Sequence, residues 1–164
     1  MPTGEDQKAR YEGLNDQAAA LWRQWLKLYQ EQFAGFTYNV RVGRGLDPGP
    51  NASEEIRKMW HAVTTKRIDV VAHRLDQTWV IEIEPRPGLR TLGQVVGYVH
   101  LLPQYHPTRQ VIVPALIAGS MGFDMSQVFR AHNISYFVFP SSGPPRLPPL
   151  FPPTYAPSLA SPVR

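Results

Sequence analysis

The order of apolar patterns in this chain predicts an α/β fold, with a mixed central β-sheet flanked by helices. Stretches with helical spacing alternate with stretches typical of strands, in the order α-β-α-β-β-α-β-α-β. One stretch, residues 110–117, is almost continuously apolar, as expected of a strand buried on both faces. The 164 residues are 43% hydrophobic and 18% charged, a composition that allows one globular domain with its own core. Helices packed on both faces of such a sheet would bury the sheet and the apolar side of each helix.

The N-terminal third of the chain predicts a helix, a strand and a loop. Residues 14–33 place apolar side chains at helical spacing and predict an amphipathic helix with a wide apolar face. Residues 36–42 alternate with a period of two, which indicates a half-buried strand. Residues 43–50 are rich in Gly and Pro and predict a loop.

A second helix is expected after this loop. Asn51 or Ser53 can cap its N-terminus, and Glu54 and Glu55 suit its first turn because acidic side chains are favoured there. Its apolar residues recur at helical spacing and are expected to face the core. These residues are Ile56, Met59, Trp60 and Val63.

The middle of the chain predicts an antiparallel hairpin followed by a third helix. Residues 67–73 and 78–84 have strand composition and are separated by a short turn. Residues 89–102 predict a helix that Pro103 ends, since proline removes a helical hydrogen bond. After the buried strand at 110–117, a short helix near 125–132 and a strand at 135–139 complete the predicted fold.

A Pro-rich tail follows this domain. Nine of the 17 prolines lie between residues 140 and 162, so we expect an extended segment without a helix or a central strand. The predicted division is a domain of residues 1–139, with its N-terminal helix at 14–33 and its core at 36–139, and a tail of residues 140–164. We expect the tail to lie on a neighbouring subunit or a partner protein. Its expected anchors are Leu147, Leu150, Phe151 and Tyr155.

Three acidic residues lie on the two hairpin strands. Asp69 interrupts the apolar run Ile68-Val70-Val71, and Glu82 and Glu84 share one face of the next strand because residues i and i+2 point the same way. A carboxylate within a buried strand is costly unless a cation or hydrogen bonds compensate it. Convergent carboxylates suit a hard divalent cation. The alternative is a solvent-facing polar edge, and alternation alone leaves it open.

Gln94 and Tyr98 lie four residues apart in the helix that follows, and therefore on one of its faces. A Gln and a Tyr at this spacing occur by chance in many helices. The pair becomes informative because it follows directly after the strand that carries Glu82 and Glu84. The alternative is that the Tyr packs under the sheet and the Gln faces solvent.

Together these residues resemble the PD-(D/E)XK nuclease superfamily, and in particular its RecB-type branch with a Q-x-x-x-Y helix. The resemblance covers roughly residues 36–139. It implies that Asp69 and Glu82 are catalytic acids that bind Mg²⁺ or Mn²⁺. The third motif position is usually Lys, but here it is Glu84, which could act as a general base or an added ligand.

The same resemblance implies contacts with DNA. In RecB-like relatives the motif helix flanks the active site, so Gln94 and Tyr98 are expected to contact the site or the DNA. Three nearby cations could supply the charge that the missing Lys would carry, or bind the substrate. They are Lys66, Arg86 and Arg90.

Two functions are compatible with this sequence. The first is a metal-dependent DNA-processing nuclease from a phage or mobile element. The excess of 17 Lys and Arg over 13 Asp and Glu suits a DNA partner, but an Arg-rich coding bias explains it as well, so charge does not decide between them. The alternative is a catalytically degenerate structural protein, such as a phage virion or neck component. In either case we expect a homo-oligomer or larger assembly formed through residues 140–164. The expected location is the host cytoplasm or a virion, without a membrane partner, because no apolar stretch is long enough to span a bilayer.

Overall fold

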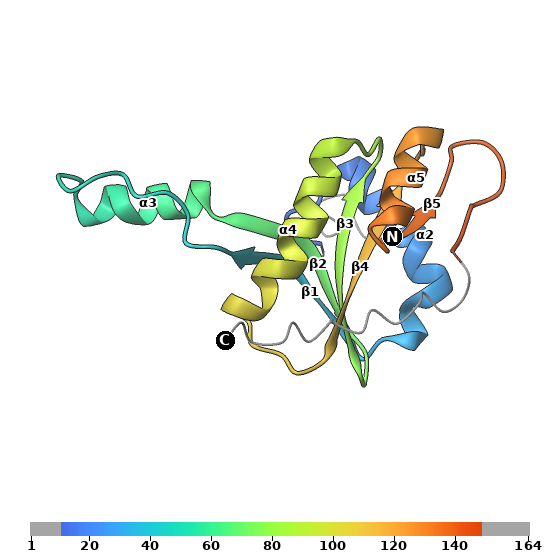
Figure 1. The fold of residues 1–164 in the computed structure, drawn as a ribbon, viewed down its shortest axis with the longest axis horizontal. Helices are drawn as coiled ribbons and strands as arrows, with labels where there is room; N and C mark the ends of the chain where they lie inside the picture. Colours follow the sequence, from blue (N-terminus) through green and yellow to red (C-terminus); the bar gives the residue numbers. More distant parts are fainter. Residues whose placement is uncertain (1–10, 149–164) are drawn as a thin grey trace, which may run out of the picture.

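A computed structural model describes residues 11–148 and contains a five-stranded sheet in the order β1-β2-β3-β4-β5 (Figure 1). Strands β1, β2 and β3 pair antiparallel, and β3, β4 and β5 pair parallel, so the predicted mixed α/β fold is confirmed. The strands are β1 Gly35–Val42, β2 Lys66–His73, β3 Gln77–Glu84, β4 Val111–Ala118 and β5 Ser135–Val138. The helices are α2 Asp16–Tyr29, the short 3-10 helix η1 Gln30–Gln32, α3 Glu54–Thr64, α4 Leu89–Tyr105 and α5 Phe123–Ala131.

Helix α2 covers one face of the sheet through an aromatic cluster. Asn15 caps this helix, and its Oδ1 accepts a hydrogen bond of 2.9 Å from the Ala18 N–H. The rings of Trp22 and Trp25 are fully buried and stack with their centroids 5.0 Å apart. They pack among side chains of the sheet such as Phe137, which lies edge-on to Trp25. Large buried rings supply much of the apolar area that stabilises this layer.

Helices α4 and α5 cover the opposite face of the sheet (Figure 1). Tyr98 of α4 packs with Val71 of β2 and Val80 of β3. Further along the sheet, Val95 of α4 and Phe129 of α5 are fully buried together. Helix α4 also connects β3 to the parallel strand β4, and this crossover places the predicted Gln and Tyr against the hairpin strands.

The second predicted helix forms, but its apolar face is not turned toward the core. Ser53 caps α3, and its Oγ accepts a hydrogen bond from the Ile56 N–H. Strands β1 and β2 continue as a two-stranded ribbon to the pair Val42–Lys66, and residues 43–65 beyond it form an arm that projects from the body (Figure 1). No residue of α3 is buried. The inward orientation predicted for this helix is therefore wrong, because periodicity shows an apolar face but not whether another element covers it.

The third predicted helix extends past the proline that was expected to end it. Helix α4 continues to Tyr105 with Pro103 inside its last turn. Pro103 removes only the hydrogen bond to the Val99 carbonyl, one turn back, and the 2.8 Å bond from the His106 N–H to the Leu102 carbonyl still closes the last turn. The remaining predicted elements are present within a few residues of their expected bounds.

The first residues of the Pro-rich tail return to their own domain. Arg146 pairs with Val138 of β5 through two backbone hydrogen bonds of 2.8 Å, and Leu147 is partly exposed beside it. Three of the four predicted anchors lie outside the described residues. They are Leu150, Phe151 and Tyr155. Within residues 11–148, no helix combines the length and apolar character needed to cross a membrane.

Candidate metal-binding and nuclease site

The predicted acids Asp69 and Glu82 meet where β2 and β3 diverge. These two strands pair from His73–Thr78 to Val70–Ile81. Beyond that pair, β2 continues along β1 into the arm, whereas β3 continues along β4 as far as Glu84. Asp69 is the next residue on β2 and Glu82 is the next residue on β3. We call this point the β2–β3 fork.

Each carboxylate at the fork accepts a hydrogen bond from a backbone N–H of the other strand. Pairing between β2 and β3 has ended at this point, so these N–H groups do not bond to a carbonyl across the hairpin. The Asp69 N–H donates to Glu82 Oε1 at 3.2 Å, and the Ile83 N–H donates to Asp69 Oδ2 at 2.9 Å. These reciprocal bonds hold both carboxylates between the two strands. Asp69 and Glu82 each lie two residues from a side chain that packs against α4, Val71 and Val80 respectively, so both belong to the α4 side of the sheet.

Burial makes these two carboxylates difficult to ionise. Glu82 is only 5% exposed, and burial together with the nearby Asp69 raises its pKa to about 9. Burial also raises the pKa of Asp69 to about 6, although the hydrogen bond from Ile83 acts in the opposite direction. The ion pairs among residues 11–148 are Arg57–Asp47 and Lys58–Glu54, so no Lys or Arg is salt-bridged to the acids of the fork. The structure therefore holds a buried carboxyl group, that of Glu82, beside the half-buried carboxyl group of Asp69, without a basic partner among residues 11–148.

Glu84 lies further along β3 and does not complete a three-carboxylate cluster. Its negative charge contributes to the raised pKa values of Asp69 and Glu82, and its Oε1 accepts a hydrogen bond of 3.3 Å from the Arg86 N–H. Among the described residues, no group of three or more His, Cys, Asp or Glu side chains is arranged to hold one metal ion. The expected arrangement of three acids around one cation is therefore reduced to a pair with a third acid nearby.

The predicted Gln and Tyr of α4 lie beside the acid pair. Tyr98 is 5% exposed, and the Gln94 side chain and the Arg67 backbone are close enough to its hydroxyl to lower its pKa, against the larger effect of burial. Burial raises the pKa of Tyr98, and the negative charges of Glu82 and Asp69 raise it further. The Tyr98 ring packs between α4 and the sheet against Val71 and Val80, and the charges of Glu82 and Asp69 act on its hydroxyl. The backbone of Arg67, which sequence reasoning did not select, completes this network.

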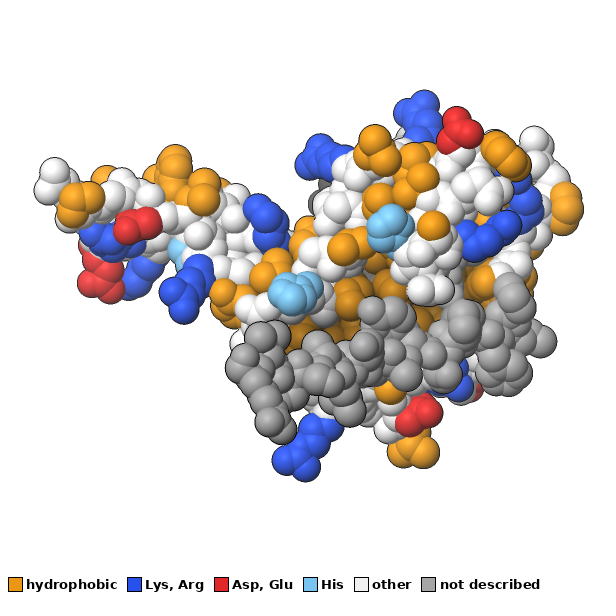
Figure 2. Space-filling view, in the orientation of Figure 1, with side chains coloured by type: hydrophobic (Ala, Val, Ile, Leu, Met, Phe, Trp, Pro, Cys, Tyr) orange, Lys and Arg blue, Asp and Glu red, His pale blue; other side chains and the backbone are white. Residues whose placement is uncertain are grey.

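The three predicted cations lie around the fork without ion-pair partners among residues 11–148. Lys66 is exposed on β2, three residues before Asp69, and Arg86 and Arg90 are exposed after β3 and in the first turn of α4. Figure 2 shows basic side chains on both sides of the recess between the arm and the body. None of the three forms an ion pair with Asp69 or Glu82.

A separate cleft of about 680 Å³ lies between α5, β5 and the start of the tail. Phe123, Arg130 and Leu147 are among the residues that line it, and the Arg130 guanidinium donates a 3.0 Å hydrogen bond to the Tyr136 hydroxyl. None of its lining residues belongs to the predicted site. The fork is therefore distinct from this cleft.

No family model matches this sequence, and no curated protein is significantly similar to it. Among solved structures, EndoMS in a complex with double-stranded DNA is 15% identical, with a TM-score of 0.43 over 82% of this chain and 49% of that chain. A repair endonuclease from Pyrococcus abyssi is 15% identical, with a TM-score of 0.46 over 80% of this chain and 50% of that chain. A protein of unknown function is 18% identical, with a TM-score of 0.45 over 71% of this chain and 56% of that chain. This chain thus spans about half the length of the structures it matches.

Proposed function

We propose that this chain is a divalent-metal-dependent nuclease that hydrolyses phosphodiester bonds in DNA. The observation that carries this proposal is the pair of carboxylates at the β2–β3 fork, of which Glu82 is buried and Asp69 half-buried. Asp69 and Glu82 come from neighbouring strands, face the same side and have no basic partner among the described residues. The residues that match the nuclease motif are the same two acids, together with Gln94 and Tyr98 beside them.

The donor set at the fork suits Mg²⁺ or Mn²⁺. Magnesium is commonly bound by one or two carboxylates, with waters and substrate phosphates as its other ligands, so a third protein acid is not required. Asp69 and Glu82 would hold the ion, and each has a second carboxylate oxygen that accepts no hydrogen bond from residues 11–148. When bound, a divalent cation offsets negative charge that develops on the phosphate and lowers the pKa of coordinated water.

The other residues of the site would position these acids and the attacking water. The reaction joins a water oxygen to phosphorus, breaks the bond to the leaving sugar oxygen and requires a group that accepts the water proton. Glu84 is the acid nearest the pair on β3 and is the candidate for that group. Tyr98 and Gln94 would hold the geometry of the pair, since the Tyr98 hydroxyl lies among Gln94, the Arg67 backbone and the acids.

Exposed cations around the fork would bind the DNA backbone. Lys66 lies on the arm side of the acids, and Arg86 and Arg90 lie on the α4 side. Arg is well suited to phosphate because its planar guanidinium donates two parallel hydrogen bonds. DNA seated across the recess would contact both groups, with a phosphate near the acid pair.

The experiment is a cleavage assay on plasmid, single-stranded and branched DNA with Mg²⁺, Mn²⁺ or EDTA. We expect cleavage with metal and none with EDTA, and we expect Asp69→Asn and Glu82→Gln to abolish it. Asp76→Asn is the matched control, because Asp76 is an exposed acid in the turn at the other end of the same hairpin. The proposal fails if the wild type cleaves none of these substrates with either metal, or if a folded Asp69→Asn protein keeps the full rate.

A further inference from the structure

The cleft between α5, β5 and the start of the tail combines basic and apolar side chains. Its volume of about 680 Å³ lies within the range of roughly 300–1,000 Å³ that is common for ligand sites. Met121, Ile134 and Leu147 contribute apolar surface, and Arg130 and Arg146 contribute positive charge. None of the described residues that line the cleft is Asp or Glu. The cleft therefore suits a ligand that has both a negative charge and an apolar part.

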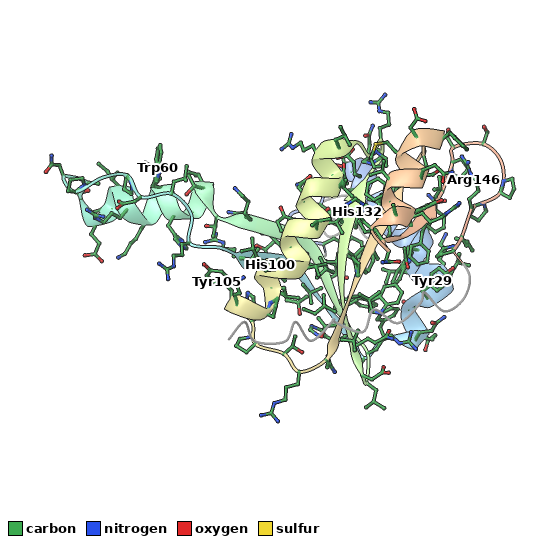
Figure 3. All side chains as sticks on the ribbon, in the orientation of Figure 1. Tyr29, Trp60, His100, Tyr105, His132 and Arg146 are labelled. Carbon is green, nitrogen blue, oxygen red and sulfur yellow. The ribbon has the colours of Figure 1, made fainter. Side chains whose placement is uncertain are left out.

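Hydrogen bonds hold both arginines at the cleft before any ligand binds. The Arg130 guanidinium donates to the Tyr136 hydroxyl at 3.0 Å. The Arg146 backbone pairs with Val138 through two bonds of 2.8 Å, and Figure 3 shows Arg146 where this returning segment passes α5. Groups that are already ordered lose less entropy when a ligand binds.

No acid of the described chain neutralises these two arginines. Neither Arg130 nor Arg146 forms an ion pair within residues 11–148. Asp124, in the first turn of α5, is the acid closest to the cleft in sequence, but it does not line the cleft and pairs with neither arginine. The positive charge of the cleft is thus available to an anion.

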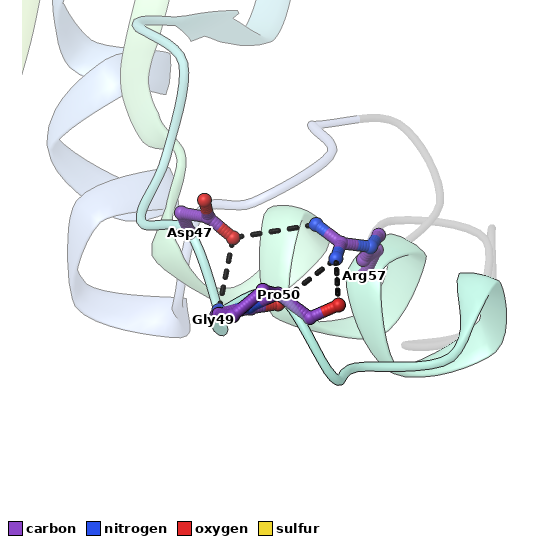
Figure 4. A network of polar contacts seen from close by, with 4 residues as sticks. All are labelled: Asp47, Gly49, Pro50 and Arg57. Atoms are coloured by element: carbon purple, nitrogen blue, oxygen red, sulfur yellow. Dashed lines mark hydrogen bonds and ion pairs between the residues drawn. The ribbon is translucent and has the colours of Figure 1, made fainter.

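Arg57 on the arm provides a contrast. Its guanidinium pairs with Asp47 at 3.3 Å and donates hydrogen bonds to the Gly49 and Pro50 carbonyls (Figure 4). These contacts hold the loop of the arm against α3. The side chains of the two cleft arginines make only the one bond to Tyr136 within residues 11–148, so most of their N–H donors remain for a ligand.

Phe123 presents an aromatic ring beside these cations. It is the first residue of α5, lines the cleft and is 77% exposed. Nucleobases stack on aromatic side chains of this kind in proteins that bind single-stranded nucleic acid. Guanidinium groups bind phosphate through paired hydrogen bonds. An exposed ring with two guanidiniums therefore matches the base and the phosphate of a nucleotide.

The cleft lies close to the β2–β3 fork across the ends of the parallel strands. Met121, which lines the cleft, belongs to the loop that follows β4. In the same loop the Gly119 and Ser120 N–H groups donate to the Pro85 carbonyl at 3.1 and 3.0 Å, and Pro85 directly follows Glu84. Strand β5 is two strands from β3, or about 10 Å. A DNA strand with one phosphate at the fork thus reaches the cleft with a nearby nucleotide.

We propose that the cleft binds a nucleotide of an unpaired DNA strand, with its base on Phe123 and its phosphate between Arg130 and Arg146. A base that stacks on a protein ring has left the duplex stack, so the strand is single here. The identity of the ligand rests on the proposed nuclease function, to which the cleft adds a substrate class, DNA with an unpaired region beside the cleaved bond. Residues 149–164 of the tail contain no Asp or Glu and lack the negative charge that the cleft requires.

Fluorescence anisotropy with a labelled 12-nucleotide single strand tests the cleft. The full chain is titrated in EDTA, where neither metal nor cleavage is needed. We expect Phe123→Ala to weaken binding about tenfold through lost stacking, and Phe123→Tyr, which keeps the ring, to bind as the wild type does. Arg146→Gln should weaken binding and reduce the slope of log affinity against log salt concentration by about 0.7, as for one phosphate contact on a single strand. Arg109→Gln is the matched control, because Arg109 is exposed in the loop before β4, outside the cleft.

A blunt duplex of the same sequence separates the unpaired nucleotide from general attraction to DNA. We expect Phe123→Ala to bind this duplex as the wild type does. The proposal is overturned if the wild type does not bind the single strand, if Phe123→Ala or Arg146→Gln binds it as tightly as the wild type, or if strand and duplex lose affinity equally. A Glu-rich peptide that displaces the labelled strand at lower concentration than unlabelled strand does would also overturn it and identify an acidic peptide as the ligand. Because binding is measured without metal, a protein that cleaves no DNA can still pass this test, and an active nuclease can fail it.

Discussion

Replacing Glu82 with Gln should stabilise this protein at neutral pH when no metal is bound. In the folded state the Glu82 carboxyl has a pKa of about 9, against an ordinary value of 4.5, because it is buried beside Asp69. A Gln at this position is neutral at every pH. Its side-chain oxygen still accepts from the Asp69 N–H, and its amide can donate to the Asp69 carboxylate. The substitution therefore removes the cost of the buried acid and keeps its hydrogen bond.

The size of this effect follows from the difference between folded and unfolded pKa values. Below pH 4.5 the Glu82 carboxyl is protonated in both states and costs nothing. Above that pH the unfolded chain releases the proton while the folded chain keeps it, so stability falls by about 1.4 kcal/mol per pH unit until the folded pKa is reached. At pH 7 the accumulated loss is about 3 kcal/mol, which the Glu82→Gln variant avoids. The pKa of Asp69, raised from 3.8 to about 6, likewise lowers the free energy of unfolding as the pH rises between these two values.

Urea unfolding, followed by the fluorescence of the buried Trp22 and Trp25, measures this difference at pH 5, 7 and 9 in EDTA. We expect Glu82→Gln to exceed the wild type by under about 1 kcal/mol at pH 5, by about 3 kcal/mol at pH 7 and by more at pH 9. Asp76→Asn should follow the wild type. A Glu82→Gln protein that is less stable than the wild type at pH 7, or a difference that does not grow with pH, would refute the reasoning.

Three further substitutions test other parts of the structure. Glu84→Lys places a cation beside the acid pair, so the pKa of Glu82 should fall, as NMR titration would show. Cleavage should fall too, because the proposed acceptor of the water proton is lost, and a fully retained rate would exclude Glu84 from that role. Tyr98→Phe should lower the free energy of unfolding in urea by about 1 kcal/mol. It should lower the cleavage rate by more than this loss of stability explains, because Gln94, Glu82 and Asp69 all act on the Tyr98 hydroxyl. Equal cleavage by the variant and the wild type would show that the hydroxyl does not position the acids. Trp22→Ala should lower the free energy of unfolding by about 3–5 kcal/mol, because it removes a fully buried ring and leaves a cavity in the aromatic cluster. Thermal denaturation measures this loss, which would be smaller if neighbouring side chains moved in to fill the cavity.

The hairpin and its acids could be predicted because the information is local. Strand composition, the short turn and the i, i+2 spacing of Glu82 and Glu84 are enough to place Asp69 and Glu82 on neighbouring strands. The fork itself could not be predicted in this way. It exists because β2 follows β1 while β3 follows β4, and these pairings join segments that are distant in the sequence.

The sequence patterns did not show which other element packs against a helix or strand, and the predictions that depended on this were wrong. The apolar spacing of α3 identifies a helix with one apolar side, but the ribbon that carries it away from the core depends on how far β1 and β2 extend. Pro103 indicates a helix end, yet its position within the last turn lets α4 continue. The three acids share a sequence pattern, whereas the fork brings only Asp69 and Glu82 into reciprocal contact.

Binding of Mn²⁺ to the full chain tests the metal site most directly, because it needs no knowledge of the DNA substrate. Titration followed by electron paramagnetic resonance should show Mn²⁺ bound by the wild type and by Asp76→Asn at pH 7.5. Glu82→Gln and Asp69→Asn should bind far less, although both remain folded. Mn²⁺ binding that is equal in the wild type and in Glu82→Gln, or absent from the wild type both with and without DNA, would contradict a metal site at the β2–β3 fork.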